Sequence, residues 1–497
     1  MTEPDGPVRR SGADGTRRPR GLLTLCGVET WERFSFYGMR AILVLYLAAP
    51  VTDGGLGLAP HTAAAVFGVY GALVNLLALP GGWIADRLWG SYRAIVRGGV
   101  VITAGHCVLA VPAGAGTTYT GLLLVAAGTG LLKPGVSTLV GRLYDAEGGD
   151  TAGAAARRDA GFSVFYLGIS LGAFAAPLVT GYLGERVAWH AGFGAAAAGM
   201  LVGLLVCVRG RDRLPVRRRA RPVSPAATYR AVGAGGAAVV FLAAGYGVAR
   251  CCGHSPTEAV VQAVTALTAV VALVCFAVLF RSAGPDPVER GRLTAYVWLF
   301  LAATVFWTVA EQGGSLISLF ARDHVDRTLA GRQVPTSWFQ SLGPLYSVLL
   351  AGGCAALWLR LGGRQPGTPA KFALALGGLG AASLVMAGAG WSAGAGRVTP
   401  LWLVVAFLVQ IVAEMLLSPT GLSVTTRLAP VRLAHRVMSL WFLSVALGSA
   451  LSAQVVRLAA VWPPGRYFAV LGAAALLVSA ALALARGRLR RLMHGVD

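Results

Sequence analysis

Charged side chains are scarce in this sequence. Asp, Glu, Lys and Arg together make up 13% of its 497 residues, whereas hydrophobic residues make up 56%. Soluble globular domains carry about a quarter charged residues. The composition therefore excludes an ordinary soluble protein, and it indicates an α-helical protein that crosses a membrane many times.

Lysine is nearly absent. Lys133 and Lys371 are the only lysines among the 43 Lys and Arg residues, and Lys133 stands inside a long apolar segment, directly before Pro134. A desolvated lysine can lose its proton, which arginine cannot do, and a proline loosens the helix in which it lies. The pair predicts a functional cation at a flexible point of a helix rather than a lysine that reaches the membrane surface.

Catalytic and metal-binding patterns are also missing. The seven cysteines show no metal-ligand spacing, and no nucleophile is accompanied by a base. Gly128 and Gly130 follow no predicted strand, so they do not form a phosphate-binding loop. We therefore expect no metal, no cofactor and no enzymatic activity. His106 lies well inside an apolar segment, and we expect it to be packed and hydrogen-bonded rather than to relay protons.

Positive charge is the abundant sign, with a formal net charge of +22. The arginines cluster at 9–20, 209–221 and 486–491, which flank apolar segments instead of forming a nucleic-acid-binding face. The positive-inside rule places these clusters, and with them both termini, in the cytoplasm. We expect a multi-pass protein of the cell membrane, surrounded by lipid, with no nucleic acid as a partner.

Fourteen segments are long and apolar enough to cross a membrane as helices. They lie near 22–49, 61–85, 94–112, 118–141, 160–183, 189–208, 230–249, 257–280, 293–320, 338–359, 370–390, 400–426, 436–459 and 467–485. The predicted organisation is a cytoplasmic tail at 1–21, a six-helix bundle at 22–208, a linker with two extra helices at 209–292, a second six-helix bundle at 293–486 and a cytoplasmic tail at 487–497.

The two groups of six carry a trace of internal repetition. Residues 133–143 and 418–428 align through Pro, Arg and Leu at one constant offset. Two repeated six-helix bundles with a substrate site between them are typical of major-facilitator transporters. The predicted fold class is therefore an all-α membrane protein with the major-facilitator fold and 14 transmembrane helices. The middle pair has ionisable residues only at its ends, so we expect it to be peripheral.

The first apolar segment contains a stripe of charges. Glu29, Glu32, Arg33 and Arg40 fall, together with Tyr37, within roughly 140° of one helix face. Charged residues inside a membrane are costly, and they usually line a protein interior or an ion pathway. The stripe therefore indicates a transporter whose first helix faces a cavity, where Tyr37 could contact a substrate.

Two further carboxylates, Glu311 and Glu414, lie in later apolar segments without an opposite charge in their own helix turn. Their partners must come from other helices, where Arg33, Arg40 and Lys133 are available. Four embedded carboxylates against three cations leave one negative charge, which one proton would neutralise. We hypothesise that protonation of one glutamate breaks an inter-helix ion pair and couples the proton to a gate.

Together these residues resemble the proton-dependent oligopeptide transporters, a peptide transporter family of the major facilitator superfamily. Glu29, Glu32, Arg33, Tyr37 and Gly38 match the family's Glu-x-x-Glu-Arg-Phe-x-Tyr-Tyr-Gly motif. Further matches at 81–86, 128–134, 159–166, 189–193, 311–312, 339–342, 418–423 and 440–442 cover all twelve core helices. The resemblance implies symport of protons with di- or tripeptides across the cytoplasmic membrane by alternating access. We expect the carrier to function as a monomer.

The resemblance also implies roles for matched residues. Arg33 and Lys133 would receive the peptide carboxylate, and Glu311 would face the peptide's amino end. Gate pairs would form between Arg40 and Glu311 and between Lys133 and Glu414. The residues expected to couple protons and to gate the carrier are Glu29, Glu32, Arg33, Arg40, Lys133, Glu311 and Glu414. Those expected to contact the substrate are Arg33, Tyr37, Lys133, Glu311, Asn75, Ser170 and Trp441.

Several positions near the expected substrate site differ from the family pattern. Phe36 and Asn75 replace tyrosines, and Gly135, Ser170 and Gly343 stand where the family has asparagine. Charged groups are kept while neutral hydrogen-bonding groups are lost, so the charges argue for proton coupling but leave the cargo open. The alternative is a family-derived carrier or exporter of a bulkier, modified or otherwise non-standard peptide-like compound.

Overall fold

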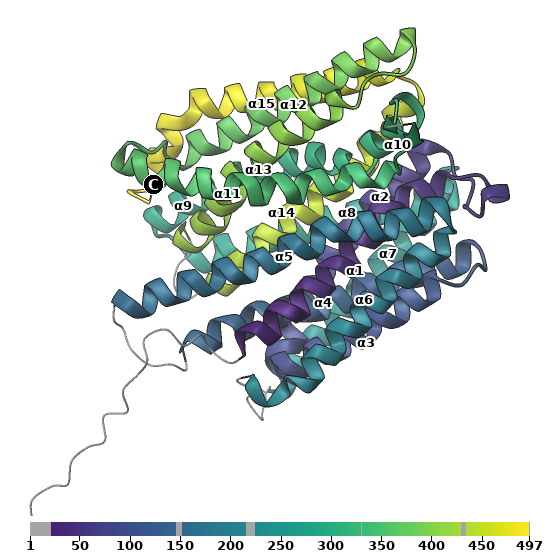
Figure 1. The fold of residues 1–497 in the computed structure, drawn as a ribbon. Helices are drawn as coiled ribbons and strands as arrows, with labels where there is room; N and C mark the ends of the chain where they lie inside the picture. Colours follow the sequence, from purple (N-terminus) through teal and green to yellow (C-terminus); the bar gives the residue numbers. More distant parts are fainter. Residues whose placement is uncertain (1–20, 146–151, 215–223, 330, 429–433, 497) are drawn as a thin grey trace, which may run out of the picture.

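The chain folds as a bundle of long helices (Figure 1). The computed structural model describes residues 21–145, 152–214, 224–329, 331–428 and 434–496. Within these ranges the only strands are β1 (Thr328–Leu329) and β2 (Arg332–Gln333), which pair as a short hairpin. The predicted N-terminal tail, apart from Gly21, lies outside the described residues. So do residues 215–223 of the predicted linker and most side chains of the motif at 159–166.

Six long helices form the first bundle. α1, α5 and α6 pack against one another, while α2 and α3 both pack on α4. The helices are α1 (Leu22–Ala48), α2 (Pro60–Ile84), α3 (Ser91–Leu109), α4 (Ala115–Asp145), α5 (Ala152–Arg186) and α6 (Trp189–Arg209). Three short turns complete it: η1 (Val51–Asp53), η2 (Ala85–Trp89) and η3 (Arg211–Arg213).

The second bundle contains a broken helix. α9 (Pro287–Ala310) is followed by the 3-10 turn η4 (Glu311–Gly314) and by α10 (Leu316–His324), and these three elements fill one predicted segment. The other elements are η5 (Thr336–Ser341), α11 (Leu342–Leu361), η6 (Gly362–Arg364), α12 (Thr368–Ser392), η7 (Ala393–Ala395), α13 (Leu401–Leu428), α14 (Ala434–Val455), η9 (Val456–Ala460) and α15 (Pro464–Leu492).

The fourteen predicted apolar segments are confirmed as long helices, one of them broken at η4. Among the described residues, twelve spans are long and apolar enough to cross a membrane. α1 and α3 fall outside that set, and α1 does so while carrying Glu29, Glu32, Arg33 and Arg40. The charges that mark α1 as functional therefore also keep it out of the set of spans chosen by composition.

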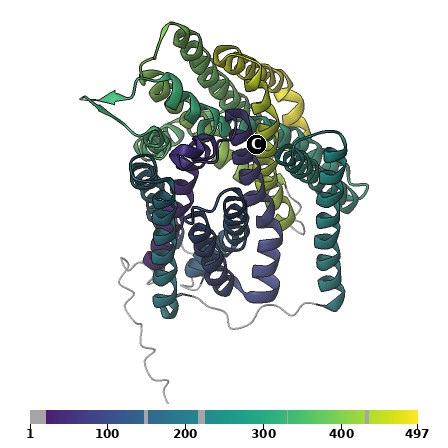
Figure 2. The same ribbon diagram turned by 90° about the vertical axis from the view of Figure 1, so that its right-hand side faces the viewer.

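The middle pair of helices, α7 (Pro225–Cys251) and α8 (Pro256–Ala283), packs as a hairpin beside the two bundles (Figure 2). α7 is exposed along its apolar length, whereas α8 packs on α2 and α14. There Thr265 Oγ1 donates to the Ala450 carbonyl at 3.3 Å and accepts from Gln454 Nε2 at 3.0 Å. α7 is thus peripheral, while α8 reaches the contact between the bundles.

Small residues let α2 and α14 approach closely where the bundles meet. A Cβ atom on Gly68 would lie 2.9 Å from the Ser449 carbonyl oxygen, and one on Gly71 would lie 3.2 Å from Ser449 Oγ. Glycine therefore allows backbone to approach backbone, as is usual for helices packed in lipid. The α2–α14 contact brings the first bundle next to η4 of the second.

The apolar core crosses between the bundles at one end of the molecule. Buried side chains of α1 to α6 there form one cluster with Phe320, Met386 and Tyr467 of the second bundle. This end contains the last residues of α1 and α5 and the first residues of α15, and we call it the closed end. A separate cluster fills the rest of the second bundle.

Candidate functional site

Three charged side chains of α1 form a buried ion cluster. Nε of Arg33 lies 2.6 Å from Oε2 of Glu32 and 3.0 Å from Oε1 of Glu29, and none of the three residues is more than 8% exposed. Glu29 precedes Arg33 by one helical turn, so both side chains reach the same face. The predicted stripe thus contains a compact cluster in which one cation is shared by two carboxylates.

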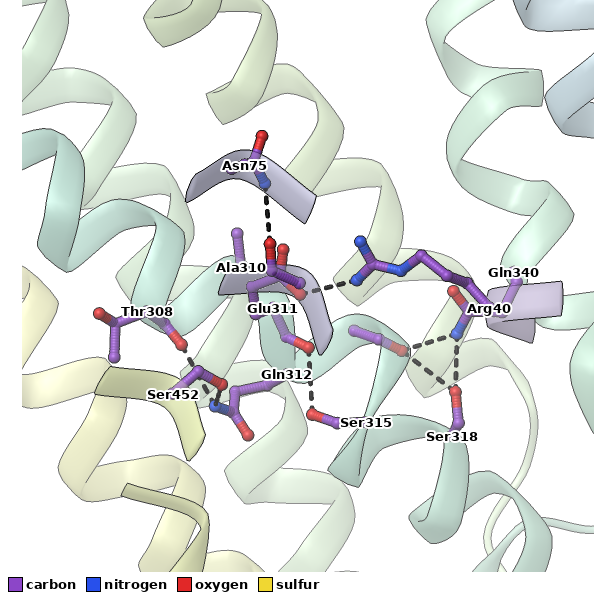
Figure 3. Close-up of polar contacts among 12 residues, drawn as sticks. Arg40, Asn75, Thr308, Ala310, Glu311, Gln312, Ser315, Ser318, Gln340 and Ser452 are labelled. Carbon is purple, nitrogen blue, oxygen red and sulfur yellow. Dashed lines mark hydrogen bonds and ion pairs between the residues drawn. The ribbon is translucent and has the colours of Figure 1, made fainter. Parts of the chain in front are cut away.

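A second ion pair joins the two bundles. Nη2 of Arg40 on α1 donates to Oε2 of Glu311 in η4 at 2.7 Å (Figure 3). The two side chains are 18% and 10% exposed, so water screens the pair poorly. Separating such a pair leaves an uncompensated charge in a poorly solvated site. The pair therefore favours the conformation in which α1 lies against the broken helix.

Aromatic rings surround the Arg40 guanidinium. Its central carbon lies 4.4 Å from the ring centre of Phe67 on α2 and 5.5 Å from that of Phe36 on α1, distances at which a ring face attracts a cation. A Cβ atom on Gly314 would lie 2.5 Å from Phe67, so the ring can occupy this place because residue 314 is glycine. α1, α2 and the end of η4 interlock around Arg40.

Lys133 on α4 has no carboxylate partner among the described residues. Its Nζ donates to Oδ1 of Asn75 on α2 at 3.4 Å and lies 5.3 Å from the ring centre of Phe442 on α14. Asn75 Nδ2 donates to the Gly71 carbonyl at 3.0 Å, which orients the amide so that its oxygen faces Lys133. An amide and a ring do not neutralise an ammonium group, so this site can accept an anion.

Glu414 on α13 is not joined to Lys133. It is partly buried, and within the described part of the chain it has neither an ion pair nor a hydrogen bond. The resemblance implied one gate pair at Arg40 and Glu311 and another at Lys133 and Glu414. The structure brings the first pair together and leaves the second apart, so the two expected gates are in opposite states.

The neighbouring aromatic residues Trp441 and Phe442 point in different directions. Trp441 is 6% exposed and packs on Gly421 of α13, where any side chain would overlap its ring. Phe442 instead faces Lys133. Sequence reasoning named Trp441 and missed Phe442, because adjacent aromatics are separated only by the rotational phase of the helix. The role predicted for Trp441 as a substrate contact stays a prediction.

The other predicted substrate contacts lie in α1 and α5. Tyr37 is 37% exposed, and its ring centre lies 5.3 Å from that of the much more buried Phe36. Ser170 is partly buried, and its hydroxyl has no hydrogen bond within the described part of the chain. Ser170 therefore keeps its hydroxyl available to a ligand, whereas the Tyr37 hydroxyl interacts with Arg33.

Two glycines that replace family asparagines have different surroundings. A Cβ atom on Gly135 would lie 2.9 Å from Ile95 Cγ1 and 3.0 Å from the Ser91 carbonyl oxygen. Gly135 thus serves the packing of α4 on α3. At Gly343, the nearest described atom to a Cβ would be Cδ1 of Ile411 at 3.5 Å. This is an ordinary van der Waals contact, so a side chain could begin at position 343 without a clash.

At the closed end, a carboxylate of the first bundle holds a helix start of the second. Glu185, near the end of α5, accepts from the backbone amides of Thr336 and Ser337 at 2.7 and 2.8 Å and from the Ser337 hydroxyl at 2.6 Å. The amides at a helix start lack partners within the helix and attract an anion. Sequence reasoning missed Glu185, because an acidic residue at the end of an apolar segment carries no pattern of its own.

Two more hydrogen bonds extend this contact along α5. Nε1 of Trp338 donates to the Leu178 carbonyl at 3.1 Å, and Oγ of Ser341 donates to the Phe174 carbonyl at 2.8 Å. α5 and η5 are thus joined over about three helical turns, from Phe174 to Glu185. The closed end is sealed by polar contacts as well as by the apolar core.

His106 on α3 is completely buried. Neither of its ring nitrogens has a hydrogen-bond partner among the described residues. The expected packing is therefore present, but the expected hydrogen bond is not. No group of three or more His, Cys, Asp and Glu residues in the described part of the chain is arranged to hold a metal ion.

Known proteins similar to this chain are transporters. A family model described as the POT family matches residues 92–469. The chain is 40% identical over 478 residues to the uncharacterized transporter YclF of Bacillus subtilis (strain 168), with 96% of each chain covered. It is 39% identical over 492 residues to the di-/tripeptide transporter of Lactococcus lactis subsp. cremoris, with 96% of this chain and 97% of the relative covered.

Solved structures are similar along nearly the whole chain. The crystal structure of the peptide transporter POT in complex with sulfate has a TM-score of 0.88 at 41% identity, and 96% of each chain is covered. A POT family transporter in complex with 5-aminolevulinic acid has a TM-score of 0.87 at 29% identity, with 95% of this chain and 97% of that chain covered. Sequence and fold point to the same set of relatives.

Proposed function

This chain belongs to the POT family, and from that membership we propose that it carries short peptides together with protons across the cytoplasmic membrane. The predicted fold class, an all-α membrane protein with the major-facilitator fold, is confirmed. Relatives named as di-/tripeptide transporters support peptides as the cargo. The two bundles, 22–208 and 293–486, are the halves that would move against each other, within a single functional monomer.

The observation that carries the proposal is the ion pair between Arg40 and Glu311. It is largely shielded from water, and it links a helix of the first bundle to the broken helix of the second. Protonation of Glu311 would remove the attraction to Arg40 and so weaken the contact between the bundles. Proton binding and opening of the closed end are therefore coupled through one carboxylate.

The conformation supports alternating access. The contacts of Glu185 and the Arg40–Glu311 pair close one end, while Lys133 and Glu414 are unpaired with each other. With both termini in the cytoplasm, this is the cytoplasm-facing state. Pairing of Lys133 with Glu414 would close the cytoplasmic side after the substrate and the proton have left, and the closed end would then open.

Under this proposal, Lys133 and Arg33 would bind the peptide carboxylate in different ways. Lys133 faces neutral groups, so it is the cation best able to receive a peptide carboxylate, with Arg33 and Tyr37 nearby on α1. Arg33 already contacts Glu29 and Glu32, so it would bind the carboxylate as part of a cluster. Glu311 would meet the peptide's amino group when Arg40 releases it.

A second candidate cargo is a bulkier or modified peptide-like compound. It is favoured by the space beside Gly343 and by the short side chain of Ser170, since both stand where the family has asparagine. Relatives solved with 5-aminolevulinic acid and with a thioalcohol-conjugated peptide bind ligands other than plain peptides. Thermal-shift screening of the purified chain against di- and tripeptides and such conjugates would identify the preferred class.

Transport by the purified chain in proteoliposomes tests the proposal. We expect an imposed pH gradient to drive uptake of labelled dialanine, and we expect a protonophore to abolish it. Unlabelled dialanine inside the vesicles should support saturable exchange without a gradient. Uptake indifferent to both gradient and protonophore would contradict proton coupling, and absence of saturable dialanine exchange would favour the second cargo.

The variant Glu311→Gln separates coupling from binding. It keeps the size of the side chain but carries no charge and binds no proton. We expect gradient-driven uptake to be lost and exchange to continue. Glu258→Gln is the matched control, because Glu258 caps the exposed start of α8 and is remote in sequence from both Arg40 and Glu311. This variant should leave driven uptake and exchange unchanged.

A further inference from the structure

The helix break at Glu311 leaves backbone groups to be satisfied by other means. η4 is a 3-10 turn between two α-helices, so the regular pairing of each carbonyl with the amide four residues later stops there. Inside a membrane no bulk water can take the place of a missing partner. The residues that replace these lost hydrogen bonds therefore determine whether the break is stable.

Side chains donate hydrogen bonds to the backbone carbonyls at the break (Figure 3). Oγ of Ser315 donates to the Glu311 carbonyl at 3.0 Å. The carbonyls before and after Glu311 accept from glutamine amides instead. Gln312 Nε2 donates to the Thr308 carbonyl at 3.2 Å, Gln410 Nε2 to the Ala310 carbonyl at 3.3 Å, and Gln340 Nε2 to the Gly313 carbonyl at 2.6 Å.

Two of the glutamines, Gln312 and Gln340, are themselves anchored. Gln312 donates to Ser452 Oγ at 2.9 Å and accepts from the Tyr467 hydroxyl at 3.0 Å, which ties the turn to α14 and α15. Gln340 also donates to Ser318 Oγ at 2.7 Å. A Cβ atom on Gly313 would lie 3.4 Å from Gln410 Nε2, so the glycine gives that amide close access to the turn.

We infer that Gln340 and Gln410 are positioning residues for Glu311, because their amides hold the carbonyls of Gly313 and Ala310 and so fix the turn that directs Glu311 at Arg40. The two amides come from η5 and α13, and they approach the turn from outside its own helix. Without them the Ala310 carbonyl would lose its side-chain donor and the Gly313 carbonyl would keep the longer hydrogen bond from Ser318 Oγ at 3.2 Å. The turn would be held less firmly, and rewinding into a regular helix would rotate Glu311 away from Arg40.

Gln340 also connects the turn to the closed end. It belongs to η5, the element whose first amides are held by Glu185 of α5. A movement of η5 away from α5 would pull Gln340 from the Gly313 carbonyl. Opening of the closed end would thereby loosen the turn and release Glu311 from Arg40. Tyr37, Tyr70 and Lys133 lie close enough to interact electrostatically with Arg40, and Glu414 does so with Glu311.

The test uses two variants and a matched control in the full chain. Gln340→Met and Gln410→Met keep the length of each side chain and remove its amide. Gln365→Met is the control, because Gln365 also donates to a carbonyl, that of Trp358 at 2.9 Å, but it does so at the exposed end of α11. If Gln340→Met does not fold, Gln340→Glu replaces it, since an ionised carboxylate has the same reach but donates no hydrogen bond.

Hydrogen exchange measured by mass spectrometry tests whether the two glutamine amides stabilise the turn, and it needs no assumption about transport. We expect amides at 312–318 to exchange about tenfold faster in the two variants, and we expect the control to match the parent chain. Unchanged exchange at 312–318 in both variants would overturn the inference. The result stands even if the parent chain proves not to move peptides.

Transport then tests the positioning role, and this part of the inference rests on the proposed function. We expect the maximal rate of gradient-driven dialanine uptake to fall about tenfold, while the KM for the peptide changes less than about twofold. Exchange of dialanine across the membrane should be retained. Exchange requires reorientation of the loaded carrier but no net proton movement. Equal loss of driven uptake and exchange would show a merely structural role, and unchanged driven uptake would also overturn the inference.

Discussion

At the scale of single residues, the three embedded cations differ in what faces them. Arg33 is shared by Glu29 and Glu32, and Arg40 is paired with Glu311. Lys133 faces the side chain of Asn75 and the ring of Phe442. The three cations therefore have different surroundings: Arg33 and Arg40 balance carboxylates, whereas Lys133 faces neutral groups, which on the proposed function would leave its charge for a ligand.

Asn75→Asp would give Lys133 a carboxylate partner in place of a neutral amide. We expect affinity for a dipeptide to fall about tenfold or more, because hydrogen bonds between charged groups are worth about 1.5–3 kcal/mol and the ligand carboxylate would have to displace one. Titration calorimetry on the purified chain measures this. Asn75→Leu removes the amide without adding charge, and an equal loss in both variants would contradict the explanation.

Arg40→Gln and Glu311→Gln would each leave one buried charge without its partner. We expect each to lower the free energy of unfolding by about 3–5 kcal/mol, and the double variant to lose much less than the sum. Equilibrium unfolding in a mild detergent gives the three values. Additive losses would show that the two side chains are not energetically coupled.

At the scale of elements, glycines decide where helices can touch. Gly314 admits the ring of Phe67, while Gly68 and Gly71 bring α2 against α14. By contrast, Gly235 on α7 has no atom within 4 Å of a Cβ position among the described residues. The many glycines of this chain thus include both close-packing positions and positions without a packing role.

Gly314→Ala would place a methyl group 2.5 Å from Phe67. Because Phe67 also faces Arg40, relief of this overlap must move the ring, the cation or the turn. We expect a loss of about 1–3 kcal/mol in the free energy of unfolding, typical of overpacked cores. Thermal unfolding of the purified protein measures it. Gly235→Ala is the matched control and should change stability little, so comparable losses in both would refute the packing argument.

The broken helix shows a limit of sequence patterns at this scale. The apolar run at 293–320 predicts one continuous helix, because hydropathy does not record backbone geometry. Gly313 and Gly314 are a weak signal for a break, but glycine is common throughout this chain. What stabilises the break are glutamines far apart in sequence, Gln340 and Gln410, whose amides meet it only in the folded bundle.

At the scale of the whole molecule, the bundles are held together at the closed end by hydrogen bonds to α5. Glu185→Gln would keep the size of the side chain but remove the negative charge that attracts the amides of Thr336 and Ser337. We expect the equilibrium to shift toward opening of this end by about 1.5–3 kcal/mol, the usual value of a hydrogen bond to a charged group. That corresponds to a several-fold change in population or more.

Distances between spin labels on Val187 and Leu329 measure that shift. Both positions are exposed, and they lie on opposite sides of the contact. We expect a longer distance to gain population in the Glu185→Gln variant. Asp323→Asn is the control, because Asp323 is exposed and pairs with its neighbour Arg322 rather than with α5. An unchanged distance distribution in Glu185→Gln would mean that the apolar core alone closes this end.

The overall architecture was predictable because its signals are local. Each span shows as a run of apolar residues, and the stripe on α1 follows from the helical period. The contacts between bundles were not predictable in the same way. Glu185 and Phe442 contact partners more than a hundred residues away, and Gln340 reaches Gly313 across 27 residues. Such contacts cannot be read from a window of sequence.

The near absence of lysine makes the carrier unusually easy to probe by amine chemistry. Reagents that acylate primary amines meet two side chains in the whole sequence, Lys133 and Lys371, besides the α-amino group. Replacing Lys371, which lies outside the site beside Gln365, with arginine would leave one reactive side chain, at the junction of α4, α2 and α14. The rate at which a small acylating reagent modifies it would then report occupancy of the pathway and access to it in a single experiment, without a reporter group being introduced.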